Sequence, residues 1–67
     1  MTTLERLVRS ANHIAANLAT DPDPTRATAQ HIADFWDPRM KAMIKAHDGS
    51  GLSAIAAAAI ATFHESA

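Results

Sequence analysis

The sequence contains no cysteine, so these 67 residues offer neither a disulfide bond nor a thiolate metal site. Short natural domains usually need such a support or a partner, because a core of this size rarely supplies more than roughly 3–5 kcal/mol. Sixteen residues are alanine, and each of these side chains buries little area. We therefore expect one domain, residues 1–67, that is marginally stable alone and folds more tightly in a complex.

Long apolar runs and an excess of one charge are also missing. The longest apolar run, Ile55 to Ala61, has seven residues, whereas a membrane-spanning helix needs about 20. The segment MTTLERLVRS places Glu5 where a secretory signal requires apolar residues. The net charge is −1, and no strongly basic face is available to follow phosphates. The composition therefore predicts a cytoplasmic protein that binds neither membranes nor nucleic acid.

Catalytic and metal-binding patterns are absent as well. The four histidines fall in four different predicted helices, and no two have the four-residue spacing of a zinc-binding HExxH pair. Five of the seven carboxylates stand at caps or turns, which leaves too few for a paired acid–base site. The GSG segment lacks the lysine of a phosphate-binding loop. We expect no catalytic residue, no metal ligand and no bound cofactor in this chain.

What the sequence does contain is helical periodicity. Apolar residues recur at steps of three and four over Thr3–Ala19, which predicts an amphipathic helix, and Thr2 with Glu5 has the spacing of a capping box. The segment TDPDPT then predicts a turn, with Asp23 as the cap of a second helix that runs to Phe35 or Trp36.

Two further helices are expected after this point. Asp37 and Pro38 predict the cap and first residue of a third helix that ends near His47, with Met40, Met43 and Ile44 as its apolar edge. Ser53 predicts the cap of a fourth helix, Ala54 to His64, whose apolar face comprises Leu52, Ile55, Ala59 and Phe63. No segment alternates with period two, so the sequence predicts an all-α bundle of about four short helices.

The junction FWDPRM holds the residues with two opposed interpretations. Trp36 either fills the gap between the second and third helices or inserts into a partner, and the core interpretation is favoured because a small domain needs its largest apolar residue. Phe35 faces the same choice. The two side chains are about 100° apart on a helix, so one can be core while the other faces a partner.

Arg39, Lys41 and Lys45 form a small basic group on the predicted third helix. The group is either a solvated helix face, which is favoured for the lysines, or a surface complementary to an acidic patch on a partner. For Arg39 the interface interpretation is favoured, because a guanidinium beside Trp36 is typical of interface anchors. On that basis, truncating Trp36 or Arg39 to alanine should weaken association and leave helical content largely intact.

The same region carries a resemblance to a known family. The stretch His31–His47, and within it the motif Phe35-Trp36-Asp37-Pro38-Arg39-Met40, resembles the delta subunit of NAD-dependent, molybdenum-containing formate dehydrogenase. Upstream, Ala11, Asn12, Ile14 and Ala15 are similar to the family's first helix. Downstream, Gly51-Leu52 and the alanine-rich segment are similar to its last. The resemblance spans nearly the whole chain.

This resemblance implies a non-catalytic small subunit that supports assembly or stability of the complex by binding the large catalytic subunit. The bis-molybdopterin guanine dinucleotide, iron–sulfur clusters, FMN and NAD of the parent enzyme would all belong to the larger subunits. The candidate partner-binding residues are Phe35, Trp36, Asp37, Arg39, Met40 and Lys41. The alternatives are a transient maturation factor for cofactor insertion and a free-standing helical homodimer.

Overall fold

The computed structural model describes residues 3–65, with the side chains of residues 3–63. It contains four α-helices, α1 (Thr3–Asn17), α2 (Pro24–Phe35), α3 (Pro38–Ala46) and α4 (Ala54–Glu65), and no strand among the described residues. The predicted all-α architecture of four short helices is confirmed. Within the described part, none of these helices is long and apolar enough to cross a membrane.

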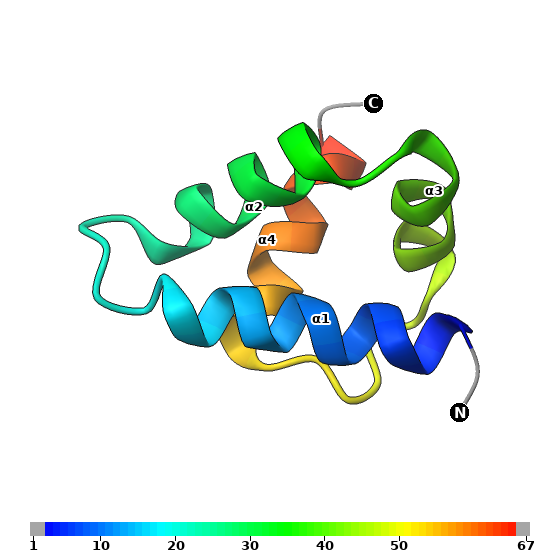
Figure 1. Ribbon diagram of the computed structural model, residues 1–67, viewed down its shortest axis with the longest axis horizontal. Coiled ribbons are helices and arrows are strands. Elements are labelled where there is room, and N and C mark those ends of the chain that lie inside the picture. Colours follow the sequence, from blue (N-terminus) through cyan, green and yellow to red (C-terminus); the bar gives the residue numbers. More distant parts are fainter. Residues whose placement is uncertain (1–2, 66–67) are drawn as a thin grey trace.

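The helices are arranged around one apolar interior. In Figure 1, α1 and α2 run in opposite directions and are joined by the turn at residues 18–23. The fourth helix crosses between them and packs most extensively on α2. The third helix lies at the far end of the molecule from the α1–α2 turn and contacts α1 and α4. The junction between α2 and α3 consists of Trp36 and Asp37.

Local signals place the starts of three helices where the sequence predicts them. The Asp23 carboxylate accepts the backbone N–H of Arg26 at 3.2 Å, and that of Asp37 accepts the N–H of Met40 at 2.8 Å. A proline follows each of these two caps at the first helical position. The Ser53 hydroxyl accepts the N–H of Ala56 at 3.3 Å, so its predicted role as the α4 cap is confirmed.

Helix ends differ slightly from the prediction. The first helix ends at Asn17, two residues earlier than predicted, because the chain enters a turn in which the Asp21 N–H donates to the carbonyl of Leu18 at 3.0 Å. The third helix ends at Ala46, and extended His47 is its C-cap. Thr2, the predicted cap of the first helix, lies outside the described residues.

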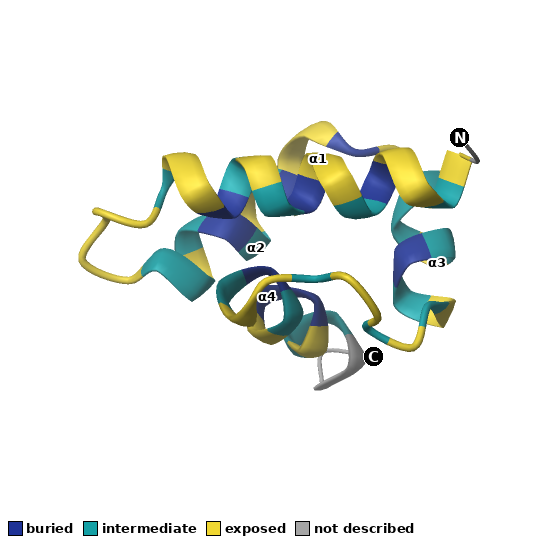
Figure 2. Ribbon diagram, turned by 90° about the horizontal axis from the view of Figure 1, so that it is seen from below, coloured by how far each residue is buried: buried dark blue, intermediate teal, exposed yellow. Residues whose placement is uncertain are grey.

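The core is built from few large side chains and several alanines. Figure 2 shows the buried positions of α1, α2 and α4 facing one another in the interior. The buried cluster consists of Leu7, Ala11, Ala15, Ile32, Trp36, Ile44, Ala56 and Ile60. Because alanine adds little bulk, helix backbones can approach closely here, and the apolar stripe predicted for the first helix is confirmed as its buried face.

The core contains positions that the sequence does not predict. Thr28 on α2 is fully buried, and Phe35, for which a core and a partner-facing interpretation were both open, is exposed. On α4 the predicted face does meet the core, since Ala59 is buried and Leu52, Ile55 and Phe63 pack against the core cluster, but Ala56 and Ile60 are buried as well. The sequence does not indicate these additional positions, because α2 and α4 carry small residues on several sides and their neighbours decide which side is covered.

Candidate interaction surface

Two residues, Trp36 and Asp37, connect α2 to α3. The N–H of Trp36 donates to the carbonyl of Ile32 at 3.0 Å, and Trp36 then adopts an extended backbone as the C-cap of α2. Asp37, also extended, begins α3, as expected for a residue before proline. The two helices are thereby connected without an intervening loop, which fixes the directions in which Phe35 and Trp36 point.

Phe35 lies on the surface of the molecule, whereas Trp36 lies in its interior. Trp36 is 7% exposed and belongs to the core cluster, so the core interpretation of this residue is the correct one. Phe35 is 74% exposed and is the large apolar side chain that the described surface leaves open. In this conformation Trp36 presents little area to a partner, and Phe35 presents almost all of its ring.

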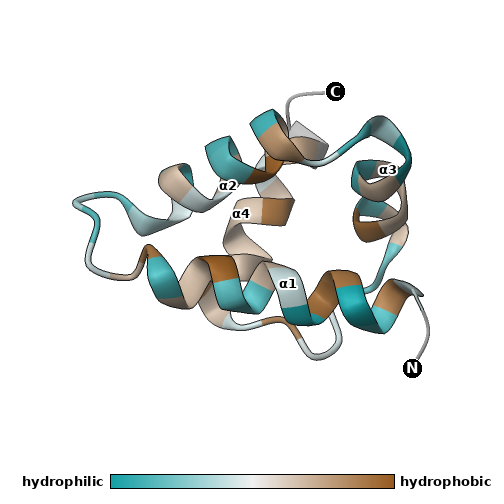
Figure 3. Cartoon of the chain, in the orientation of Figure 1, coloured by the Kyte–Doolittle hydropathy of each residue, from teal (hydrophilic) through white to brown (hydrophobic). Residues whose placement is uncertain are grey.

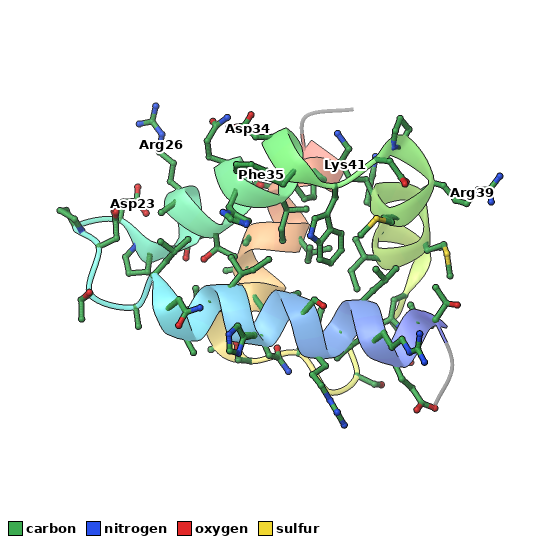
Figure 4. All side chains as sticks on the ribbon, viewed as in Figure 1. Asp23, Arg26, Asp34, Phe35, Arg39 and Lys41 are labelled. Atoms are coloured by element: carbon green, nitrogen blue, oxygen red, sulfur yellow. The ribbon has the colours of Figure 1, made fainter. Side chains whose placement is uncertain are left out.

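The Phe35 ring contacts one other ring on the same helix. It packs against the ring of His31, one turn earlier on α2, with ring centroids 4.6 Å apart and planes tilted by 33°. Offset and tilted arrangements at this distance are favourable for aromatic rings. Phe35, which lies on α2 (Figure 4), therefore combines this ring contact with an exposed position.

The basic side chains of α3 differ in their surroundings. The Lys41 ammonium donates to the carbonyl of Ala33 at 3.2 Å, at the C-terminal end of α2, and no ion pair joins it to Asp37 in the described part of the chain. Arg39 is exposed and projects away from the helices (Figure 4). The guanidinium and the buried indole of Trp36 do not form one exposed corner, so that part of the expectation is wrong.

The remaining candidate residues are divided between surface and core. Asp37 is exposed but its carboxylate caps α3. Met40 is half-buried against the core cluster. Of the six residues expected to bind a partner, the structure thus leaves Phe35 and Arg39 with exposed side chains that have no structural task. The partner-binding role of this set stays a prediction.

One important residue pair was missed by reasoning from the sequence. The Asn12 carboxamide donates to the carbonyl of Gly51 at 2.8 Å and accepts the backbone N–H of Ser53 at 2.7 Å. Gly51 has a φ of +81°, and a side chain at this position would begin 3.4 Å from Val8, so the α3–α4 loop lies directly over α1. No short-range pattern could reveal a contact across this distance in sequence.

The same loop carries a small polar cluster. The N–H of Ser50 donates to Asp48 at 2.9 Å, and this bond, with further contributions from the Ser50 hydroxyl and from His47, lowers the pKa of the Asp48 carboxyl. The Nε2 atom of His47 lies 2.8 Å from the carbonyl oxygen of Ser50. These contacts join His47, Asp48 and Ser50 to one another at the start of the loop.

Concave features are shallow. The larger one, of about 620 Å³, lies between α1 and the α3–α4 loop, and it is lined by Leu4, Glu5, Val8, Arg9, Asn12, His47, Ser50 and Gly51. A second, of about 440 Å³, is lined by Arg9, Ser10, His13, Ile14 and Trp36. The described residues contain no group of three potential metal ligands.

Comparison with known proteins gives one match. No curated protein and no solved structure matches the chain. The model of the family described as NADH-dependent formate dehydrogenase delta subunit FdsD matches residues 6–60, which include most of α1, all of α2 and α3, and the first part of α4. Since this match covers most of the sequence, the chain belongs to the family of NADH-dependent formate dehydrogenase delta subunits.

Proposed function

We propose that this chain is a non-catalytic accessory subunit that binds the large molybdenum-containing subunit of an NAD-dependent formate dehydrogenase and supports its assembly or stability. The observation that carries the proposal, beside family membership, is the 74% exposure of Phe35. A domain with so few large apolar residues loses core material by leaving one outside. The exposure is understandable if a partner covers the ring in the complex.

The chemistry of the chain supports an accessory role. Its 67 residues contain no cysteine with which to ligate an iron–sulfur cluster. Among the described residues there is no group of three side chains that could hold a metal ion. We therefore assign bis-molybdopterin guanine dinucleotide, the iron–sulfur clusters, FMN and NAD to the larger subunits, and none of them to this chain.

The test is affinity purification of the tagged chain from its native cell. The expected result is co-purification of a large molybdopterin-containing polypeptide, in fixed stoichiometry with the active enzyme. Phe35→Ser should reduce this co-purification strongly, because aromatic anchors dominate interface energies. Leu18→Ala is the matched control, since Leu18 is a half-exposed apolar residue outside the core cluster, beside the α1–α2 turn.

Three outcomes would count against the proposal. Capture of no formate dehydrogenase subunit would remove the partner. Binding only to enzyme that lacks its molybdenum cofactor, with loss from the active complex, would identify a transient maturation factor instead. A discrete dimer of the isolated chain that Phe35→Ser converts to a monomer, with unchanged capture of the large subunit, would assign the exposed ring to self-association.

A further inference from the structure

The surface of α3 carries an unbalanced charge. Three of the chain's six lysines and arginines, Arg39, Lys41 and Lys45, lie within its nine residues, and the helix contains no acidic residue. Figure 3 shows that the α2–α3 junction and the first turn of α3 are largely hydrophilic. Across the side chains that the structure describes, no ion pair joins any of the three cations to a carboxylate.

Two of these cations have a structural explanation. Lys41 satisfies the carbonyl of Ala33 at the end of α2, where a positive charge also complements the negative end of the helix dipole. Lys45 lies in the last turn of α3, where its charge is favourable for the same reason. Neither residue requires a partner to account for its presence.

Arg39 has no such explanation. It is the second residue of α3, where the positive end of the helix dipole disfavours a cation. The nearest carboxylate in sequence, that of Asp37, is directed to the N–H of Met40. The guanidinium is exposed and extends away from the molecule (Figure 4). Within this chain, therefore, the charge of Arg39 is a cost that no described contact offsets.

We propose that Arg39 forms an ion pair with a carboxylate-bearing surface of the partner subunit. The inference rests on the proposed function and adds the chemistry of the partner's contact surface. A protein is favoured over nucleic acid because exposed Asp34 and Asp37 lie within a few residues of Arg39 and would repel a continuous phosphate backbone. An exposed aromatic ring close in sequence to an arginine is also typical of protein interfaces.

The chain contains a matched control in Arg26. This arginine also lies in the first turn of its helix and is exposed, but Asp21 and Asp23 line the same shallow depression as its side chain. Figure 4 shows Arg26 and Arg39 at opposite ends of the molecule. Replacing either one with glutamine removes a single positive charge, and only the Arg39 substitution removes the proposed contact.

The experiment measures the affinity of the chain for the purified large subunit at low and at high salt. Arg39→Gln should weaken binding by about tenfold or more at low salt and reduce the salt dependence of the wild-type affinity. The affinity of Arg39→Lys should lie between those of the wild type and Arg39→Gln, because an ammonium cannot reproduce a bidentate guanidinium contact. Arg26→Gln should bind within about twofold of wild type. Thermal unfolding of isolated Arg39→Gln should occur at or above the wild-type temperature.

Each other result has a defined meaning. If the wild-type chain fails to bind at any salt concentration, the proposed function fails, and this inference fails with it. If the wild type binds but Arg39→Gln and Arg26→Gln behave alike, only the ion pair is rejected. A lower unfolding temperature for Arg39→Gln would assign the residue a structural role. Retention of the wild-type chain on random-sequence duplex DNA, abolished by Arg39→Gln, would assign this face to nucleic acid and overturn the proposal.

Discussion

The side-chain carboxamide of Asn12 on α1 accepts the backbone N–H of Ser53, the cap residue of α4, at 2.7 Å across 41 residues of sequence. The same carboxamide donates to Gly51, so both of its functional groups are used on one loop. Because Ser53 also caps α4, the contact ties the start of that helix to the middle of α1. A single polar side chain thereby sets how α4 enters the core.

Asn12→Ala should therefore destabilise the fold. The substitution leaves one carbonyl and one N–H without their partner, and each net hydrogen bond of this kind contributes about 0.5–1.5 kcal/mol. We expect a loss of about 1–3 kcal/mol in the free energy of unfolding, measured by urea denaturation. His13→Ala, at the exposed neighbouring position on α1, should change stability by less than about 0.5 kcal/mol. Equal stability of the two variants would contradict the role of Asn12.

Removal of the Thr28 hydroxyl, unlike removal of the Asn12 carboxamide, should not destabilise the fold. The Thr28 side chain is fully buried, and its hydroxyl has no hydrogen-bond partner in the structure. Thr28→Val replaces the hydroxyl with a methyl group of similar shape, so we expect unchanged or higher stability, by up to about 1 kcal/mol. Thr28→Ser keeps the hydroxyl and removes a buried methyl, which should cost about 1 kcal/mol. A destabilised valine variant, measured by thermal unfolding, would show that the hydroxyl is satisfied in solution.

Alanine substitutions of Trp36 and Phe35 should distinguish an effect on the stability of the fold from an effect on partner binding. Removal of a buried tryptophan costs about 3–5 kcal/mol, which is comparable to the whole stability of a domain of this size. Trp36→Ala should therefore unfold the isolated chain, contrary to the expectation from the sequence that helical content would survive. Phe35→Ala, at a position 74% exposed, should keep the circular dichroism spectrum of the wild type. Native-like helicity in Trp36→Ala would show that the indole is not required by the core.

The pH dependence of the α3–α4 loop follows from Asp48. Its carboxyl has a pKa below the ordinary value of 3.8, chiefly because it accepts the N–H of Ser50. A carboxyl whose pKa is lowered on folding adds stability above its unfolded pKa and loses that contribution as the pH falls through the folded pKa. The contribution should thus be complete at neutral pH, begin to decline below about pH 4, and be lost as the pH falls through the lower folded pKa.

An NMR titration of the Asp48 side-chain carbon checks this directly. The midpoint should lie below 3.8 in the wild type. It should move toward the ordinary value in Ser50→Pro, which lacks the donating N–H. In Asp48→Asn, the amide resonances of the loop should become insensitive to pH in this range. A midpoint at or above the ordinary value would show that the Ser50 contact is not formed in solution.

Much of this fold could be predicted because its signals are local. Asp23, Asp37 and Ser53 cap their helices through bonds that span three residues, so sequence spacing alone indicates them. The stripe on α1 is equally readable, since charged residues occupy its other face.

The features that the sequence misses lie where the pattern contains too little contrast or where contacts are distant. The run Ile55 to Ala61 is apolar on every side, so nothing in it indicates that Ala56 and Ile60 are buried as well as Ala59. Thr28 was omitted because polar residues are usually outside. The contact of Asn12 with Ser53 depends on how the whole chain folds back, and no short window contains both residues.

For the candidate interaction surface, the partner-binding role of the segment stays a prediction, while the sequence favoured the buried position of Trp36 and left that of Phe35 open. Adjacent residues on a helix point about 100° apart, so Phe35 and Trp36 had to differ. Which of the two enters the core depends on where α4 and α1 lie, and these positions are set by the tertiary structure.

The alanines at positions 11, 15, 56 and 59 have a consequence for anyone who wishes to redesign this domain. Each is completely or almost completely enclosed. In such a setting even one added methylene would have to displace a neighbouring helix. Larger side chains at these positions should therefore lower the stability of the fold. Stabilising substitutions are expected instead in turns and at outward-facing positions, away from Phe35 and Arg39.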